Sequence, residues 1–294
     1  MKRFVTRPKG SRVCKAAALL LLCVVCLVPV LGGGRQTPSA VSPVAEGLSR
    51  IGGIPLSNPH SFIFAVFGDN RGSTTVFERL LDGISDDPDI LFAISTGDIV
   101  GTGSQARFDF FFSQVNRCLT KPLVFAVGNH ELLGGGAGLY PSVVGSRDYS
   151  FVFGDACFII VDDTKPNGID AAGEDLLSNE LDAADGYEET FVFMHVPLYD
   201  PPGTDISHSL APSAAERLMG LFRGHRVTHI FCSHIHGFYQ GSWEGIPFTI
   251  SGGAGAPLIG TDPDHYFYHY LKVRVSDGET TVEPVPVTTD DTRG

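Results

Sequence analysis

The chain has 294 residues, of which 43% are hydrophobic, and 21 of them are phenylalanines. This composition excludes a disordered chain and suits one large α/β domain with a substantial core. The formal net charge is −12, and without residues 1–34, which hold six cations, 15 Lys and Arg face 33 Asp and Glu. Such an acidic surface repels nucleic acid polymers and anionic membranes, so we expect no nucleic acid partner, and an anionic substrate would need local positive charge to bind.

The N-terminal segment has the pattern of an export signal. Residues 1–15 are basic, and residues 16–31 form an apolar run. A basic region followed by such a run is typical of a secretory signal peptide. The long basic region also suits an uncleaved anchor that holds the N-terminus inside. We therefore expect residues 1–34 to be a signal peptide or membrane anchor, with the remaining chain periplasmic or extracellular.

Strand-like and helix-like segments alternate through the rest of the chain. The composition of residues 35–58, rich in Pro, Ser and Gly, predicts a flexible linker. Apolar runs typical of buried strands lie at 62–67, 90–95, 123–127, 149–161, 190–194 and 227–232. Helical spacing of apolar residues lies at 74–84, 105–119, 174–184 and 213–223. This alternation predicts one α/β domain over residues 59–288, with a β-rich end and a tail at 289–294.

Potential metal ligands follow five of these apolar runs. They are Asp69, Asp98, Asn129 with His130, His195, and His234 with His236. In open α/β sheets, ligands bind at the carboxyl ends of strands. Oxygen and imidazole ligands without thiolate suit Mn, Fe or Zn, and two such ions together promote phosphoryl displacement. The pattern favours a dinuclear metal site over ordinary packing of the histidines.

In chain order, the motifs G-D, G-D, G-N-H-E, H and H-x-H resemble the calcineurin-like metallophosphoesterase superfamily over residues 62–275. The resemblance implies a four-layer α-β-β-α sandwich of two mixed sheets with flanking helices. It also implies that Asp69, Asp98 and His236 bind the first metal. The second metal would be bound by Asp98, as a bridge, with Asn129, His195 and His234. His130 would contact the substrate phosphate and protonate the leaving group.

The first motif departs from the family pattern D-x-H because Arg71 occupies the histidine position. A guanidinium has no acceptor and cannot bind a metal ion. Either Arg71 holds a phosphate oxygen, or the first metal site is weakened, or Arg71 pairs with a surface acid. Purple acid phosphatases of the superfamily carry a metal-bound tyrosine where this chain has Gly101, so the resemblance implies divalent ions here.

We therefore expect an exported dinuclear-metal phosphoesterase that hydrolyses a phosphate monoester or diester by attack of a metal-bound hydroxide. The alternative is a metal- or phosphate-binding protein without turnover. His208, in the loop at 197–213, is a lesser candidate for substrate contact. Cys118, Cys157 and Cys232 are expected to be buried thiols, although one disulfide plus a free thiol is open. His269 is expected to belong to strand packing.

Overall fold

Two mixed β-sheets form the centre of the computed structural model, which describes residues 41–165, 167–201 and 208–289. The first sheet has the order β11-β10-β1-β2-β3, and the second has the order β4-β5-β6-β7-β9-β8. The strands of the first sheet are β1 (Ser61–Phe67), β2 (Ile90–Ser95), β3 (Leu123–Phe125), β10 (His269–Ser276) and β11 (Glu279–Pro286). Those of the second are β4 (Tyr149–Phe153), β5 (Ala156–Ile160), β6 (Glu189–Phe193), β7 (His229–Cys232), β8 (Phe238–Trp243) and β9 (Ile246–Ser251).

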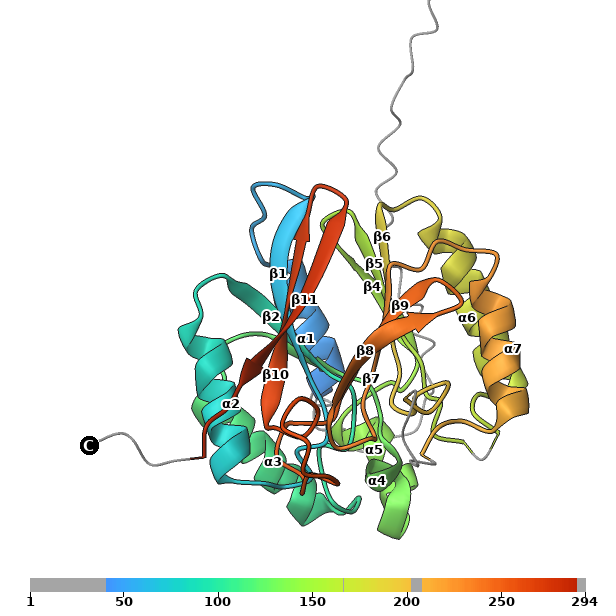
Figure 1. Cartoon of the computed structure of the whole chain (residues 1–294). Coiled ribbons are helices and arrows are strands. Elements are labelled where there is room, and N and C mark those ends of the chain that lie inside the picture. The colour runs from blue at the N-terminus through green and yellow to red at the C-terminus, as the bar shows by residue number, and fades with distance from the viewer. Residues whose placement is uncertain (1–40, 166, 202–207, 290–294) are drawn as a thin grey trace, which may run out of the picture. The chain divides into compact units, whose positions relative to one another are not determined.

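Helices cover the outer faces of both sheets (Figure 1). The first sheet carries α2 (Thr75–Asp86), α3 (Gln105–Cys118) and α5 (Gly136–Val143), while α1 (Pro43–Gly52) packs against the edge strands β3 and β4 of the two sheets. The second carries α6 (Ala171–Ala184) and α7 (Pro212–Phe222). The short helices α4 (Asn129–Leu132) and η1 (Leu133–Gly135) follow β3. The predicted α-β-β-α sandwich is therefore confirmed.

Phenylalanines fill the space between the sheets because alternate residues of a strand point to opposite faces. On β1, Phe64 faces the second sheet, and Ala65 faces the helices. The ring of Phe64 stacks on Phe92 at 5.4 Å and meets Phe191 edge-on at 5.5 Å. This packing fixes the two sheets against each other, and so fixes the relative positions of their strand ends.

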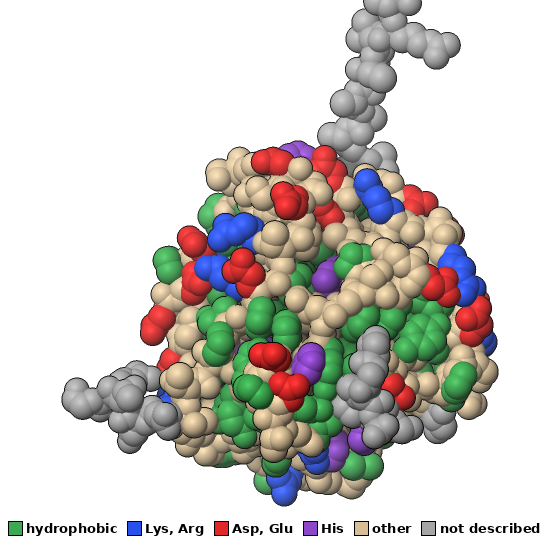
Figure 2. All heavy atoms as spheres, in the orientation of Figure 1, with side chains coloured by type: hydrophobic (Ala, Val, Ile, Leu, Met, Phe, Trp, Pro, Cys, Tyr) green, Lys and Arg blue, Asp and Glu red, His purple; other side chains and the backbone are tan. Residues whose placement is uncertain are grey.

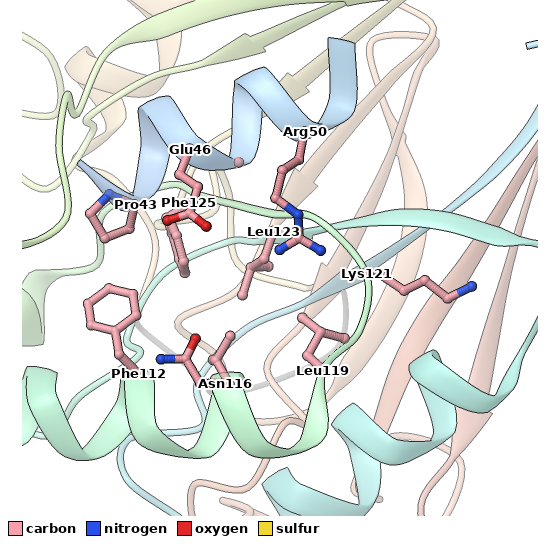
Figure 3. A pocket seen from close by; sticks show the side chains of 11 residues that line it. Pro43, Glu46, Arg50, Phe112, Asn116, Leu119, Lys121, Leu123 and Phe125 are labelled. Carbon is pink, nitrogen blue, oxygen red and sulfur yellow. The ribbon is translucent and has the colours of Figure 1, made fainter. Parts of the chain in front are cut away.

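The prediction of a flexible linker is wrong over residues 43–52, which form α1. The Ser42 side chain accepts a hydrogen bond from the Ala45 backbone N–H, and Pro43 occupies the first turn, as is typical of a helix start. Val44 and Ile51 are buried. Side chains of α1 and α3 line a pocket of about 180 Å³ (Figure 3). The Pro- and Gly-rich composition masked an apolar stripe with helical spacing.

The contact between α1 and β3 predicts opposite effects for two glycine substitutions. A Cβ on Gly47 would lie 2.1 Å from the Leu123 carbonyl oxygen, whereas one on Gly52 would meet nothing within 4 Å. We expect Gly47→Ala to destabilise the fold by about 1–3 kcal/mol. Gly52→Ala in the same helix should leave stability unchanged or raise it by up to about 1 kcal/mol. Urea unfolding of both variants measures this, and equal effects would contradict the packing of α1.

The three cysteines that lie in the described residues are free. Cys157 and Cys232 are buried, as expected, and Cys118 is half-buried. The predicted export segment, residues 1–34, lies outside the described residues, as do residues 290–294 of the predicted tail. Within the described ranges, no helix has the length and apolar character needed to cross a membrane.

His269 lies buried at the start of β10, which confirms its predicted role in packing. Its Nδ1 lies 2.9 Å from the Phe267 carbonyl oxygen, and its Nε2 lies 3.0 Å from the Ser251 hydroxyl. These partners suit a neutral ring that donates from Nδ1 and accepts at Nε2. Burial lowers the pKa of His269 to about 4, from an ordinary value of 6.5.

This depressed pKa predicts a loss of stability in acid. The unfolded chain takes up a proton below pH 6.5, while the folded chain resists it until about pH 4. The contribution is therefore complete above pH 6.5 and is lost as the pH falls toward 4. We expect His269→Gln to reduce the fall in unfolding free energy between pH 7.5 and 4.5 by about 1–3 kcal/mol. His265→Gln, which changes a half-exposed histidine, is the control and should retain the full fall.

Candidate metal centre

The ligand-type side chains lie at the carboxyl ends of strands from both sheets. Asp69 follows β1, Asp98 follows β2, and Asn129 begins α4 just beyond β3. His195 follows β6, and His234 and His236 follow β7. Because the sheets pack face to face, these ends lie together. Asp98, His195 and His234 place one ligand atom each within 4.8 Å of one another.

Acceptor atoms converge around Nε2 of His195. Nδ1 of this ring lies 3.0 Å from the Thr96 carbonyl oxygen, which requires a proton on Nδ1 and leaves the lone pair of the neutral ring on Nε2. Nε2 lies 3.0 Å from Asn129 Oδ1, 3.4 Å from Asp98 Oδ1 and 3.1 Å from His234 Nδ1. Burial opposes a charge on His195, yet the nearby Asp98 and other acids raise its pKa to about 9. The surroundings therefore favour a cation.

A second group forms around Asp69, which is fully buried. His236 Nδ1 lies 2.8 Å from the Pro257 carbonyl oxygen, and its Nε2 lies 3.4 Å from Asp69 Oδ1. Asp69 Oδ2 accepts a hydrogen bond from the His234 backbone N–H, but Oδ1 has no hydrogen-bond partner. Burial would raise the pKa of Asp69, but His236 and the other imidazoles hold it at about 2. A buried acceptor without a partner is costly, and a bound cation would satisfy it.

The backbone is strained at the same positions. Asp69, Arg71, Asp98 and His234 have φ values of 62°, 46°, 53° and 66°. Non-glycine residues rarely adopt the left-handed region, and such strain clusters at functional sites. Three of these four residues, Asp69, Asp98 and His234, are among the ligand-type residues of the site.

Glu131 holds the loops that carry the ligand-type residues. The sequence analysis missed this role, although Glu131 is the last residue of the G-N-H-E motif. Its buried carboxylate accepts hydrogen bonds from the backbone N–H groups of Asp98 (2.8 Å), Gly128 (2.6 Å) and Val100 (3.0 Å). Burial, aided by the charge of Asp98, raises the pKa of Glu131 to about 8. Glu131 thus joins the loop after β2 to the loop after β3.

Asp163 is a second supporting residue that the sequence analysis missed. Its carboxylate accepts from the backbone N–H groups of His195 (3.0 Å) and Val196 (2.8 Å). Burial raises its pKa to about 7. The sequence signal for Asp163 is its position just beyond the apolar run at 149–161.

Arg71 and His130 lie together at one side of the site. His130 Nδ1 lies 2.8 Å from the Gly101 carbonyl oxygen and 3.2 Å from Arg71 Nη2. The His130 backbone N–H donates to Asp98 Oδ1 at 3.0 Å. Among the described residues, Arg71 forms an ion pair with no carboxylate, which disfavours the surface-pair interpretation. His208 lies at another side, with its ring centre 5.9 Å from that of His234.

This fold and these ligand-type residues are those of a known protein family. Residues 62–238 match the sequence model of the calcineurin-like phosphoesterases, and the chain belongs to this family, which is dinuclear-metal dependent. The resemblance stated from the motifs is thereby confirmed.

Among curated proteins, a probable cyclic nucleotide phosphodiesterase of Rhodopseudomonas palustris is 29% identical over 180 residues, 56% of this chain and 64% of that protein. Two solved structures share the fold. A purple acid phosphatase from yellow lupin (Lupinus luteus) matches with a TM-score of 0.63 and 17% identity, over 79% of this chain and 52% of its own. A dimetal phosphatase from Danio rerio matches with a TM-score of 0.60 and 15% identity, over 78% of this chain and 99% of its own. The chain therefore spans only part of the first two relatives.

Proposed function

We propose that this chain hydrolyses small phosphate monoesters or diesters at a centre of two divalent transition-metal ions, Mn, Fe or Zn. The observation that carries the proposal is the convergence of carboxylate, amide and imidazole acceptors, with Asp69 Oδ1 buried and without a hydrogen-bond partner. The first ion would be held by Asp69, Asp98 and His236. The second would be held by Asp98, Asn129, His195 and His234.

When bound, such an ion pair supplies Lewis-acid stabilisation of the phosphoryl oxygens and lowers the pKa of water. The protein's own contribution begins with His130. The Gly101 carbonyl oxygen, the nearer of two partners, fixes a proton on Nδ1. Nε2 therefore gives a proton to the leaving oxygen from the imidazolium form of the ring, which carries a proton on both nitrogens. Arg71 cannot donate to a protonated Nδ1, so its N–H groups remain available for a phosphate oxygen.

Hydrolysis assays test this proposal and choose between ester classes. The substrates are p-nitrophenyl phosphate, its bis ester and a cyclic nucleotide, which the name of the Rhodopseudomonas relative suggests. Each is assayed with added Mn²⁺, Fe²⁺ or Zn²⁺. We expect metal-dependent turnover of at least one ester, and its identity assigns the class. A chain that binds metal but hydrolyses none of them contradicts the proposal.

The competing function is a metal- or phosphate-binding protein without turnover, whose first metal site Arg71 weakens. Arg71→His separates the two functions because it restores the D-x-H pattern. Under our proposal the variant loses a charged phosphate contact, and KM rises by about 10-fold or more. Under the competing function the variant gains metal content and turnover relative to the natural chain.

We also propose that the catalytic domain acts outside the cytoplasm. The support is the basic segment at 1–15 followed by the apolar run at 16–31. A fusion of residues 1–58 to a reporter that is active only after export tests this. Reporter activity is expected, and a reporter that stays inactive inside the cell contradicts the proposal. Sequencing of the exported N-terminus then distinguishes a cleaved signal from an anchor.

A further inference from the structure

We propose that Arg107 and Arg71 form a subsite for a second anionic group, carried on the leaving-group side of the substrate. The inference rests on the proposed function, since it places the subsite next to His130. It narrows the substrate class to phosphate esters or anhydrides whose leaving group bears a further phosphoryl or carboxylate group.

Gly101 fixes the location of this subsite. Its carbonyl oxygen lies 2.8 Å from Nδ1 of His130, the residue that faces the leaving oxygen. A Cβ built on Gly101 would lie 3.6 Å from Arg107 Nη1 and 3.4 Å from the Arg71 backbone oxygen. The guanidinium of Arg107, from the first turn of α3, therefore lies beside Gly101. Arg71 Nη2 lies 3.2 Å from the same His130 Nδ1 that contacts the Gly101 carbonyl oxygen, so both arginines lie near Gly101.

No carboxylate among the described residues offsets the charge of Arg107. On the face shown in Figure 2, blue side chains mostly lie beside red ones. Cations that pair with carboxylates include Arg117, Arg147, Lys165, Arg217, Arg223 and Lys272. Within the described residues, Arg107 has no such partner, and the first turn of α3 contains no acid. In a chain with 33 Asp and Glu, an uncompensated cation beside the proposed active site indicates an anionic ligand.

Glycine at position 101 keeps a side chain away from the Arg107 guanidinium. Its φ is outside the left-handed region, so the backbone does not require glycine. A Cβ there would already contact Arg107 Nη1 and the Arg71 backbone oxygen at ordinary van der Waals distances. Planar guanidinium groups bind phosphoryl and carboxylate oxygens with paired hydrogen bonds, so both anions suit a pair of arginines.

Anion binding to the metal-loaded full chain tests the inference. Calorimetry measures the dissociation constants of phosphate, pyrophosphate and phosphonoacetate, and inhibition of p-nitrophenyl phosphate hydrolysis measures them independently. Arg107→Gln should weaken pyrophosphate, phosphonoacetate or both by about 10-fold more than it weakens phosphate. Arg274→Gln is the matched control because it removes the same charge from an exposed residue away from the site. Arg274 lies on β10 opposite Ile63, near the start of β1, whereas the site lies beyond the end of β1. Arg274→Gln should leave the ratio of the phosphate dissociation constant to that of each two-headed anion unchanged. Pyrophosphate also chelates metal ions, but this effect is the same in every variant and does not alter the comparison.

The anion that responds identifies the second group as phosphoryl or carboxylate. The subsite would be overturned if Arg107→Gln weakened the binding of phosphate and of both two-headed anions equally. It would also be overturned if Arg274→Gln weakened the two-headed anions as selectively as Arg107→Gln does. Failure of the proposed function gives a different result. Turnover would then be absent in every variant, while calorimetry would still show whether Arg107 discriminates between the anions.

Discussion

Asp98→Asn is expected to lower kcat/KM for p-nitrophenyl phosphate by at least about 10³-fold and to reduce the metal content from near two ions per chain to one or fewer. Asp98 is the carboxylate assigned to both ions, and its Oδ1 faces both Nε2 of His195 and the backbone N–H of His130. Asparagine keeps the shape but removes the negative charge that would hold two cations together. Elemental analysis and steady-state kinetics on the same preparation measure both effects.

Asp155→Asn is the matched control for this substitution. Asp155 forms a second group of ligand-type residues with His60 and Glu188, next to the amino ends of β1, β5 and β6. His60 Nδ1 lies 2.8 Å from Glu188 Oε2, so an ordinary surface ion pair accounts for this group. We expect Asp155→Asn to keep the metal content and the activity. If Asp155→Asn lost metal while Asp98→Asn kept it, the ions would lie at the amino ends of the strands, which would contradict the proposed site.

His130→Ala is expected to lower kcat by about 10²- to 10⁴-fold without loss of metal. Its ring is held at Nδ1 by the Gly101 carbonyl oxygen, which directs Nε2 toward the site. Protonation matters most for a poor leaving group, so the loss should be larger for phenyl phosphate than for p-nitrophenyl phosphate. His225→Ala, which removes a histidine that lies beside surface acids on the second sheet's side, should affect neither substrate. Equal losses for both substrates would show that His130 positions the phosphate and does not act as the acid.

The ligand-type residues at the strand ends could be predicted from sequence because a run of apolar residues stops there and polar residues follow it directly. Asp69 and Asp98 each follow an apolar strand, and the structure shows both buried with strained backbones. The sandwich followed from the resemblance that these motifs carried. The helix α1 was missed because its helical signal is only ten residues long and lies in a Pro- and Gly-rich context.

Supporting residues were harder to predict because their partners are backbone groups distant in sequence. Asp163 accepts from the backbone N–H of His195, 32 positions away, and Glu131 accepts from that of Asp98, 33 positions away. The G-N-H-E motif and the end of the apolar run at 149–161 mark these two positions, but neither pattern shows which backbone groups the side chains contact. The proximity of Arg107 to Arg71 likewise depends on how α3 packs beside the loop after β1, which sequence spacing does not specify.

The central claim is that this site holds two metal ions and uses them for phosphoester hydrolysis. The most direct test is elemental analysis of the chain purified without chelator, followed by removal and re-addition of metal during hydrolysis of p-nitrophenyl phosphate and its bis ester. We predict close to two transition-metal ions per chain, loss of turnover on their removal, and recovery with Mn²⁺, Fe²⁺ or Zn²⁺. One ion or fewer, with no turnover under any of these metals, would contradict the account.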